Sequence, residues 1–106
     1  MEVLRYQSSD GTEPFTEWLG SLRDKNAQAQ IRLRLRRLEV GLLGDVEPAG
    51  DGVSELRIHV GAGYRVYFGQ QGKRLIILLC GGDKKSQRAD IDQAKGLWKD
   101  WKRRQP

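Results

Sequence analysis

The sequence predicts an α+β domain in which helices flank a small antiparallel sheet. Apolar residues recur at helical spacing near both ends of the chain, a middle stretch alternates apolar and polar residues, and residues 74–80 are almost uniformly apolar. The 106 residues can bury one hydrophobic core, so we expect a single domain over residues 1–106. The expected element order is β-α-α-β-β-β-α, with the two N-terminal helices packed on one face of the sheet and a C-terminal helix at the end.

The chain is expected to start with a short strand and a first helix. Residues 2–7 favour the strand, which the turn sequence SSDGT ends. Thr12 is the expected N-cap of the helix that follows, and Pro14 fits its first turn. The apolar stripe of this helix is Phe15, Trp18, Leu19 and Leu22.

A second helix is expected after Asp24, whose side chain can cap it. Gly41 and Gly44 fit its end, and its apolar stripe is Ala27, Ile31, Leu35, Leu38 and Leu42. Four arginines decorate the rest of its surface: Arg32, Arg34, Arg36 and Arg37. This pattern has two interpretations, a solvated helix face or a docking surface for an acidic partner or for RNA phosphates.

The second half is expected to complete the sheet and end in a helix. Residues 44–52 are a loop or an irregular edge strand, because Pro48 cannot donate a hydrogen bond to a ladder. A hairpin follows over residues 55–68, and the apolar strand 74–80 is expected to be central and covered on both faces. A last helix is expected from Ser86 to Arg103, with the apolar stripe Ile91, Ala94, Trp98 and Trp101.

The hairpin is expected to gather its charged side chains on one face of the sheet. Because side chains alternate along a strand, Glu55, Arg57 and His59 point away from the apolar face. A three-residue loop, Gly61-Ala62-Gly63, predicts the cross-strand pairs Ile58 with Val66, His59 with Arg65 and Arg57 with Tyr67. Clustered guanidinium groups suit an anion. The alternative is an ordinary wet sheet face on which Glu55 neutralises one arginine.

Lys84 and Lys85 follow the central strand, just before the last helix begins. A helix N-terminus attracts anions, so these lysines would deepen the same positive potential. The alternative is a solvated turn in which Asp83 or Ser86 caps the helix.

Composition limits the partners and the compartment. The chain has 19 Lys and Arg against 14 Asp and Glu, a net charge of +5 that fits nucleic acid or an acidic protein. The lone cysteine, Cys80, lies in an apolar run and suits a reducing compartment. No signal peptide or membrane span is expected, so the protein is predicted to be cytoplasmic. With one histidine and one cysteine, no metal and no cofactor is expected.

Four segments resemble the RelE/ParE superfamily of type II toxin–antitoxin toxins: SELRI, GYRVYF, LLCGGDKKSQ and DIDQAKGLW. The nearest branch is the HigB-like group of addiction module killer proteins, and the resemblance spans almost the whole chain. It implies an α+β fold with an antiparallel sheet flanked by helices. It also implies an endoribonuclease that cuts mRNA on the ribosome and inhibits translation. The implied partner is a cognate antitoxin, a small helix-turn-helix protein encoded next to the toxin.

The resemblance also implies a site built from arginine, lysine, tyrosine and sometimes histidine or glutamate. The expected catalytic residues are Arg57, His59, Arg65 and Lys84, and the expected substrate-binding residues are Tyr67, Lys85 and Glu55. The arginines would stabilise the charge of the phosphorane. His59 would remove the 2′ proton, with Glu55 as the fallback, while Tyr67 would stack on a base or donate a hydrogen bond. The chain lacks the histidine near the C-terminus that some ribonuclease members use, so the general acid is left open.

Three other functions fit the same sequence. A ParE-like inhibitor of DNA gyrase shares the fold and needs no ribonuclease site. A non-catalytic protein would bind RNA or its antitoxin without cutting. A degenerate toxin would no longer arrest growth.

Overall fold

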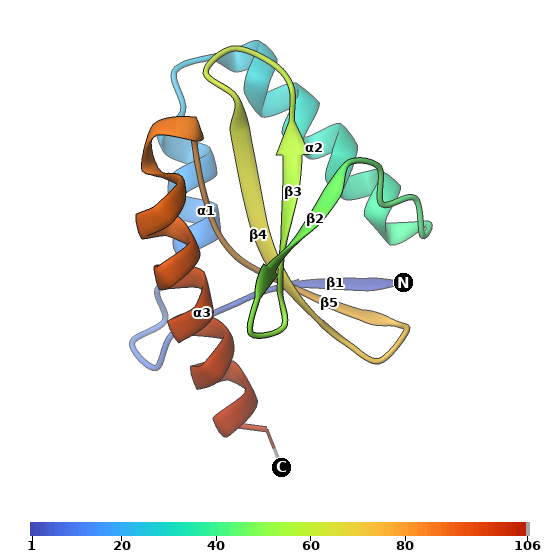
Figure 1. The fold of residues 1–106 in the computed structure, drawn as a ribbon, viewed down its shortest axis with the longest axis vertical. Coiled ribbons are helices and arrows are strands. Elements are labelled where there is room, and N and C mark those ends of the chain that lie inside the picture. Colours follow the sequence, from blue (N-terminus) through green and yellow to red (C-terminus); the bar gives the residue numbers. More distant parts are fainter. Residues whose placement is uncertain (106) are drawn as a thin grey trace.

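The computed structural model describes residues 1–105, which form a five-stranded sheet with helices on both faces (Figure 1). The strands are β1 (Glu2–Arg5), β2 (Val46–Gly50), β3 (Val53–Ile58), β4 (Tyr64–Gln71) and β5 (Leu75–Gly82). The helices are α1 (Pro14–Ser21), α2 (Lys25–Glu39) and α3 (Gln87–Arg103), with a short 3-10 helix, η1 (Lys84–Ser86), before α3. The predicted α+β class is confirmed.

The sheet has the strand order β1-β5-β4-β3-β2 and is mixed. Strands β2 to β5 form the expected antiparallel meander, but β1 runs parallel to β5, so the expectation of an antiparallel sheet is wrong for this strand. The chain leaves β1 through α1 and α2 and re-enters the sheet at the far edge, which leaves β1 beside the last strand. Residues 46–50 form an irregular edge strand with a bulge between Pro48 and Gly50, and not a loop. The observed order is therefore β-α-α-β-β-β-β-α, so the expected order β-α-α-β-β-β-α is wrong by one strand.

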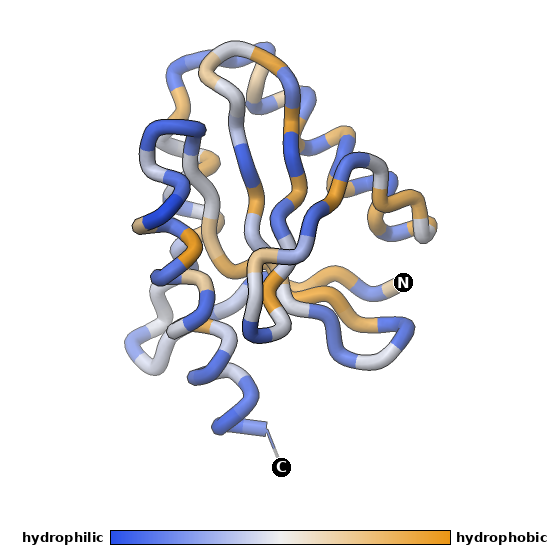
Figure 2. Tube along the Cα trace, viewed as in Figure 1, coloured by the Kyte–Doolittle hydropathy of each residue, from blue (hydrophilic) through white to orange (hydrophobic). Residues whose placement is uncertain are grey.

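Two hydrophobic clusters fill the spaces on the two sides of the sheet. One lies under α1 and α2 and includes Phe15, Ile31 and Leu38. The other lies under α3 and includes Ala94 and Trp98. Strand β5 contributes to both clusters, which confirms that it is covered on both faces, and Figure 2 shows it as a hydrophobic segment. Among residues 1–105, no helix has the length and apolar character that a membrane crossing needs.

The helix ends follow the predicted signals only in part. The Asp24 side chain accepts a hydrogen bond from the Ala27 N–H at 3.0 Å, which confirms it as the N-cap of α2. The N-cap of α1 is Glu13 and not Thr12, with Pro14 at the first helical position. Helix α2 ends at Glu39, so Leu42 lies beyond it and is exposed.

Two strand glycines allow the helices to approach the sheet closely. A Cβ on Gly69 in β4 would overlap the ring of Trp98 from α3, and a Cβ on Gly81 in β5 would overlap the ring of Trp18 from α1. Each tryptophan therefore lies directly on the backbone of a strand. The contact between Gly69 and Trp98 sets the distance between α3 and β4.

Replacing Gly69 with alanine should lower the free energy of unfolding by about 2 kcal/mol, because the added methyl group displaces the Trp98 ring. The matched control is Gly96→Ala in α3, where a Cβ would meet nothing within 4 Å. That change should raise stability by about 0.5–1 kcal/mol, since alanine favours a helix over glycine. Urea unfolding of both variants measures the two effects, and equal stability of the two would contradict this packing.

Candidate anion-binding site

The hairpin holds its charged residues in a register that differs from the predicted one. Arg57 lies opposite Arg65, Glu55 opposite Tyr67 and Ile58 opposite Tyr64. The predicted pairs of Arg57 with Tyr67, His59 with Arg65 and Ile58 with Val66 are wrong. The loop has five residues, from 59 to 63, because both of its glycines adopt positive φ and the chain turns before it re-enters the sheet. A shift of two residues leaves each side chain on its face, so the predicted faces are confirmed for the strand residues.

Glu55 is the centre of the charged face, with its side chain only 3% exposed. Its carboxylate lies 2.6 Å from Arg65 Nε and 3.6 Å from Arg57 Nη2. Gln87 Nε2, from the first turn of α3, donates a hydrogen bond to the same carboxylate at 2.8 Å, and the Tyr67 hydroxyl donates one at 3.5 Å. We call these five residues the Glu55 cluster. Glu55 therefore pairs with two arginines, where the sequence suggested one.

Two guanidinium groups share one carboxylate in the Glu55 cluster, which leaves one positive charge in excess. Within residues 1–105, the buried Arg57 Nε–H has no hydrogen-bond acceptor, whereas Arg65 Nε lies 2.6 Å from Glu55 as an ion pair without hydrogen-bond alignment. A guanidinium carries five donors, so neither arginine is saturated by Glu55. The arrangement is suited to an anion placed where Arg57 reaches the surface, since its side chain is 34% exposed and that of Arg65 only 13%.

Tyr67 and Glu55 are too deeply buried for the substrate contacts predicted for them. Tyr67 is 0% exposed and packs in the cluster under α3, so stacking on an RNA base is wrong for this structure. Burial, and secondarily the Glu55 carboxylate, raises the pKa of Tyr67, so its hydroxyl stays protonated and remains a donor. Glu55 acts on any ligand only through the arginines that it holds.

His59 lies in the loop after β3, and the structure does not place it on the sheet face with Arg65. Its imidazole is 72% exposed, and Nε2 lies 2.5 Å from Asp45 Oδ2. Asp45 directly precedes β2, and its carbonyl accepts the Arg57 N–H at 3.0 Å. The hydrogen bond from His59 lowers the pKa of Asp45, and Arg57 lowers it further. The His59–Asp45 pair is therefore next to Arg57, at the edge of the Glu55 cluster.

Lys84 and Lys85 open η1 and are exposed. Asp83 caps this turn, because its Oδ1 accepts hydrogen bonds from the Lys85 N–H at 2.9 Å and the Ser86 N–H at 3.2 Å. A Cβ on Gly63 would lie 3.6 Å from the Lys84 Cβ, so η1 packs against the hairpin loop. The Gly63 carbonyl also accepts a hydrogen bond from Arg65 at 3.4 Å. Gly63 thus lies next to both Lys84 and Arg65.

Three residues of this region were missed by sequence reasoning. Gln87 contacts Glu55, and Asp45 contacts His59. Each comes from a segment distant from its partner, so no local sequence pattern predicts these contacts. Arg34 was placed on the outer surface of α2, but it is half-buried and donates to the carbonyls of Arg57 at 2.6 Å and Leu43 at 3.1 Å. Burial lowers the pKa of Arg34. The two hydrogen bonds of this arginine hold the end of β3 in place.

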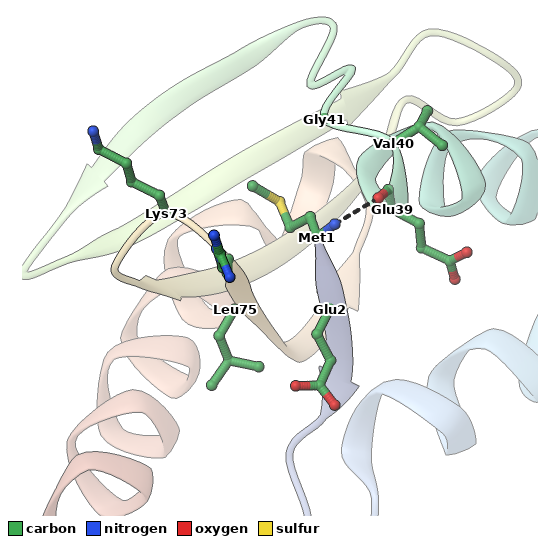
Figure 3. A pocket seen from close by; sticks show the side chains of 8 residues that line it. Met1, Glu2, Glu39, Val40, Gly41, Lys73 and Leu75 are labelled. Atoms are coloured by element: carbon green, nitrogen blue, oxygen red, sulfur yellow. Dashed lines mark hydrogen bonds between the residues drawn. The ribbon is translucent and has the colours of Figure 1, made fainter.

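The predicted site is separate from an open hollow of about 670 Å³ at the start of β1. Figure 3 shows this hollow between Met1, the end of α2 at Glu39, and Lys73 in the β4–β5 turn. None of the predicted site residues lines it. In residues 1–105, no three His, Cys, Asp or Glu side chains are grouped to hold a metal ion.

Comparisons with known proteins cover most of the chain. Residues 17–99 match the family model described as "Phage derived protein Gp49-like (DUF891)". A protein of Haemophilus influenzae, described as uncharacterized, is 50% identical over 86 residues, which are 81% of this chain and 87% of that protein. The residues matched by the family model include the Glu55 cluster, the His59–Asp45 pair and both lysines of η1.

Removing the Glu55 carboxylate should destabilise the protein at neutral pH. Glu55→Ala leaves two guanidinium groups without their buried partner, so the free energy of unfolding should fall by about 3 kcal/mol. The control is Glu47→Ala, an exposed glutamate directly opposite Glu55 on β2, which should change stability by no more than about 0.5 kcal/mol. Chemical denaturation measures both, and a similar small loss in the two variants would show that Glu55 does not organise this face.

The His59–Asp45 pair can be detected by titration. The pKa of Asp45 should lie below the ordinary 3.8 in the wild type and rise toward it in His59→Gln. The lowered pKa means that the charged Asp45 stabilises the folded protein at pH values above the ordinary carboxyl pKa. This stabilisation is lost as the pH falls through the lowered pKa of Asp45. Carboxyl ¹³C NMR follows the titration.

Asp10, whose pKa is lowered to about 2 by hydrogen bonds from Ser8 and Thr12, is the internal control and should not respond. An unchanged Asp45 midpoint in His59→Gln would mean that the two residues are not paired in solution.

Proposed function

This chain belongs to the Gp49-like family of toxin-like addiction-module proteins, and we propose that it is a type II toxin that cleaves mRNA without a metal ion. The observation that carries the proposal is the Glu55 cluster, where Arg57 and Arg65 share one carboxylate and keep an excess positive charge. The His59–Asp45 pair lies next to Arg57, and the exposed Lys84 lies against the hairpin loop at Gly63. The target is mRNA on the ribosome, translation is the process inhibited, and a cognate antitoxin holds the toxin inactive.

The phosphate group is bound by Arg57 at the surface, with Arg65 behind it. Attack of the ribose 2′ oxygen on phosphorus forms a phosphorane with an additional negative charge. Guanidinium groups already fixed in position stabilise that charge without reorganising, and in many enzymes such stabilisation accelerates the reaction more than any other effect. Glu55 and Gln87 are positioning residues here, because they hold the arginines and touch no RNA.

His59 accepts the proton of the 2′ hydroxyl on Nδ1, since its Nε2 is engaged by Asp45. The carboxylate of Asp45 then stabilises the imidazolium that forms. The bond from phosphorus to the 5′ oxygen breaks, and Lys84 gives a proton to that leaving oxygen. Lys85 holds a neighbouring phosphate. The products are a 2′,3′-cyclic phosphate and a free 5′ hydroxyl, so no water or metal enters this step.

Arg57→Ala and Arg65→Ala should each reduce cleavage by about 10²-fold or more, because each removes charge that stabilises the phosphorane. Mapping of RNA 5′ ends after induction in cells measures the cleavage. Arg65→Lys keeps the charge but loses the planar contact with Glu55, and we expect only partial recovery. The control is Arg103→Ala at the C-terminal end of α3, where the exposed side chain bonds to Asp100 and to no other side chain in residues 1–105.

Full cleavage by a folded Arg57→Ala or Arg65→Ala variant would overturn the assignment. Growth arrest without new RNA ends, together with altered DNA supercoiling, would favour a gyrase inhibitor. RNA binding without new ends would favour a non-catalytic protein. Circular dichroism and thermal unfolding of each variant separate loss of function from loss of fold.

A further inference from the structure

Helix α3 ends in two tryptophans that stack on each other. The ring centroids of Trp98 and Trp101 lie 5.3 Å apart, and the ring planes are 8° from parallel. Trp98 is part of the core, because it is 4% exposed and its ring lies on the backbone of Gly69. Trp101 is only half-buried and packs at the edge of the cluster under α3. A large aromatic ring is therefore left partly uncovered where the helix ends.

An open hollow of about 440 Å³ lies beside these two rings. Trp98, Trp101 and Lys102 line it from the end of α3, and Gln71 and Gly72 line it from the turn between β4 and β5. Sites for small ligands usually enclose about 300–1,000 Å³, so the hollow has room for one planar group. Its lining combines an aromatic surface with an amide and a positive charge.

The side chain of Gln71 is directed to the α3 side of the sheet. Side chains alternate along β4, and Tyr67 and Gly69 already face α3. Gln71 continues that face, and its cross-strand partner, Leu75, packs against the cluster under α3. The glutamine is exposed, and its amide can donate and accept hydrogen bonds at the same time. Such an amide matches the donor and acceptor pattern on the edge of a nucleobase.

The hollow also carries a positive charge that the chain does not neutralise. Lys102 Nζ lies 5.5 Å from the centroid of the Trp98 ring, a cation–π contact that holds the ammonium group beside the aromatic surface. Among residues 1–105, Lys102 forms no ion pair. Asp100, the one acidic residue in residues 95–105, is already engaged by Tyr6 and by two arginines. The lysine is therefore available to an anion.

We propose that the end of α3 binds one unpaired base of single-stranded RNA. The base stacks on Trp101, the Gln71 amide bonds to its edge, and Lys102 contacts an adjoining phosphate. This inference rests on the proposed function, because RNA is the ligand in both. From Gln87 in the Glu55 cluster to Trp101, the axis of α3 rises about 21 Å. The base is thus held several nucleotides away from the phosphate at Arg57.

The probe is a fluorescein-labelled hexamer of 2′-O-methyladenylate, which attack by a 2′ oxygen cannot cleave, titrated into the full chain and followed by anisotropy. Its affinity should fall about tenfold in Trp101→Ala, because stacking on one ring contributes about that factor. Trp101→Phe keeps a ring in place and should lose no more than about threefold. Gln71→Ala alters an exposed residue outside the core and should lose about threefold, which tests the site even if Trp101→Ala unfolds.

The charge of Lys102 is tested by salt dependence. Lys102→Ala should reduce the slope of log affinity against log salt concentration by about 0.7, the value for one phosphate contact on a single strand. The matched control is Lys99→Ala, the same charge change at an exposed position of α3 that does not line the hollow, and its slope should change less. Equal changes in the two variants would overturn the phosphate contact at Lys102.

The indole N–H signals in ¹H–¹⁵N NMR locate the base without any substitution. Those of Trp98 and Trp101 should shift when the hexamer binds, whereas that of Trp18, on the other side of the sheet under α1, should not. The Arg57→Ala protein should give the same shifts at saturation, so the base site can stand even if the proposed cleavage fails. An unchanged Trp101 signal at saturation would overturn the base site while leaving cleavage untouched.

A hexamer of abasic nucleotides keeps the phosphates but has no bases, so it should bind at least about tenfold more weakly than the adenylate hexamer. Equal binding of the abasic hexamer would overturn stacking at Trp101. Adenosine monophosphate that binds as tightly as the hexamer would overturn the assignment to RNA and identify the hollow as a site for a free nucleotide.

Discussion

The buried carboxylate of Glu55 is the interaction on which the charged face of this protein depends. Without it, Arg57 and Arg65 would lie opposite each other on adjacent strands as two unpaired like charges, an arrangement that destabilises a sheet. With it, the two side chains are held in place from β3 and β4, and Gln87 ties the same carboxylate to the start of α3. The positive charge is thus fixed by the fold itself before any ligand arrives.

The sheet separates two surfaces that carry clustered arginines. On the α3 side lies the Glu55 cluster, whereas His59 lines a hollow together with Arg34 and Arg37 of α2. On the α1–α2 side, Arg5, Arg32 and Arg36 surround a small hollow beside β1. The two surfaces can be altered by separate substitutions, since no residue belongs to both.

Sequence periodicity correctly predicted which face of the sheet each strand residue occupies, but it did not predict the cross-strand pairs. The alternation in β3 and β4 placed Glu55, Arg57, Arg65 and Tyr67 on one side correctly, because an error of two residues in register leaves the faces unchanged. The length of the loop depended on the positive φ angles of its glycines, and this detail moved His59 off the strand. The burial of Tyr67, the parallel pairing of β1 and the contact of Asp45 with His59 all join distant segments, which no local pattern encodes.

The chemistry of the cut RNA tests the central claim most directly. The purified protein is incubated with ribosomes that carry mRNA in the presence of a metal chelator at a level that preserves the ribosome, and the new RNA ends are identified by mass spectrometry. Attack by the 2′ oxygen, supported by fixed arginines, predicts 2′,3′-cyclic phosphate and 5′-hydroxyl ends that are absent with the Arg57→Ala protein. Ends with a 3′ hydroxyl and a 5′ phosphate, or intact mRNA, would contradict it.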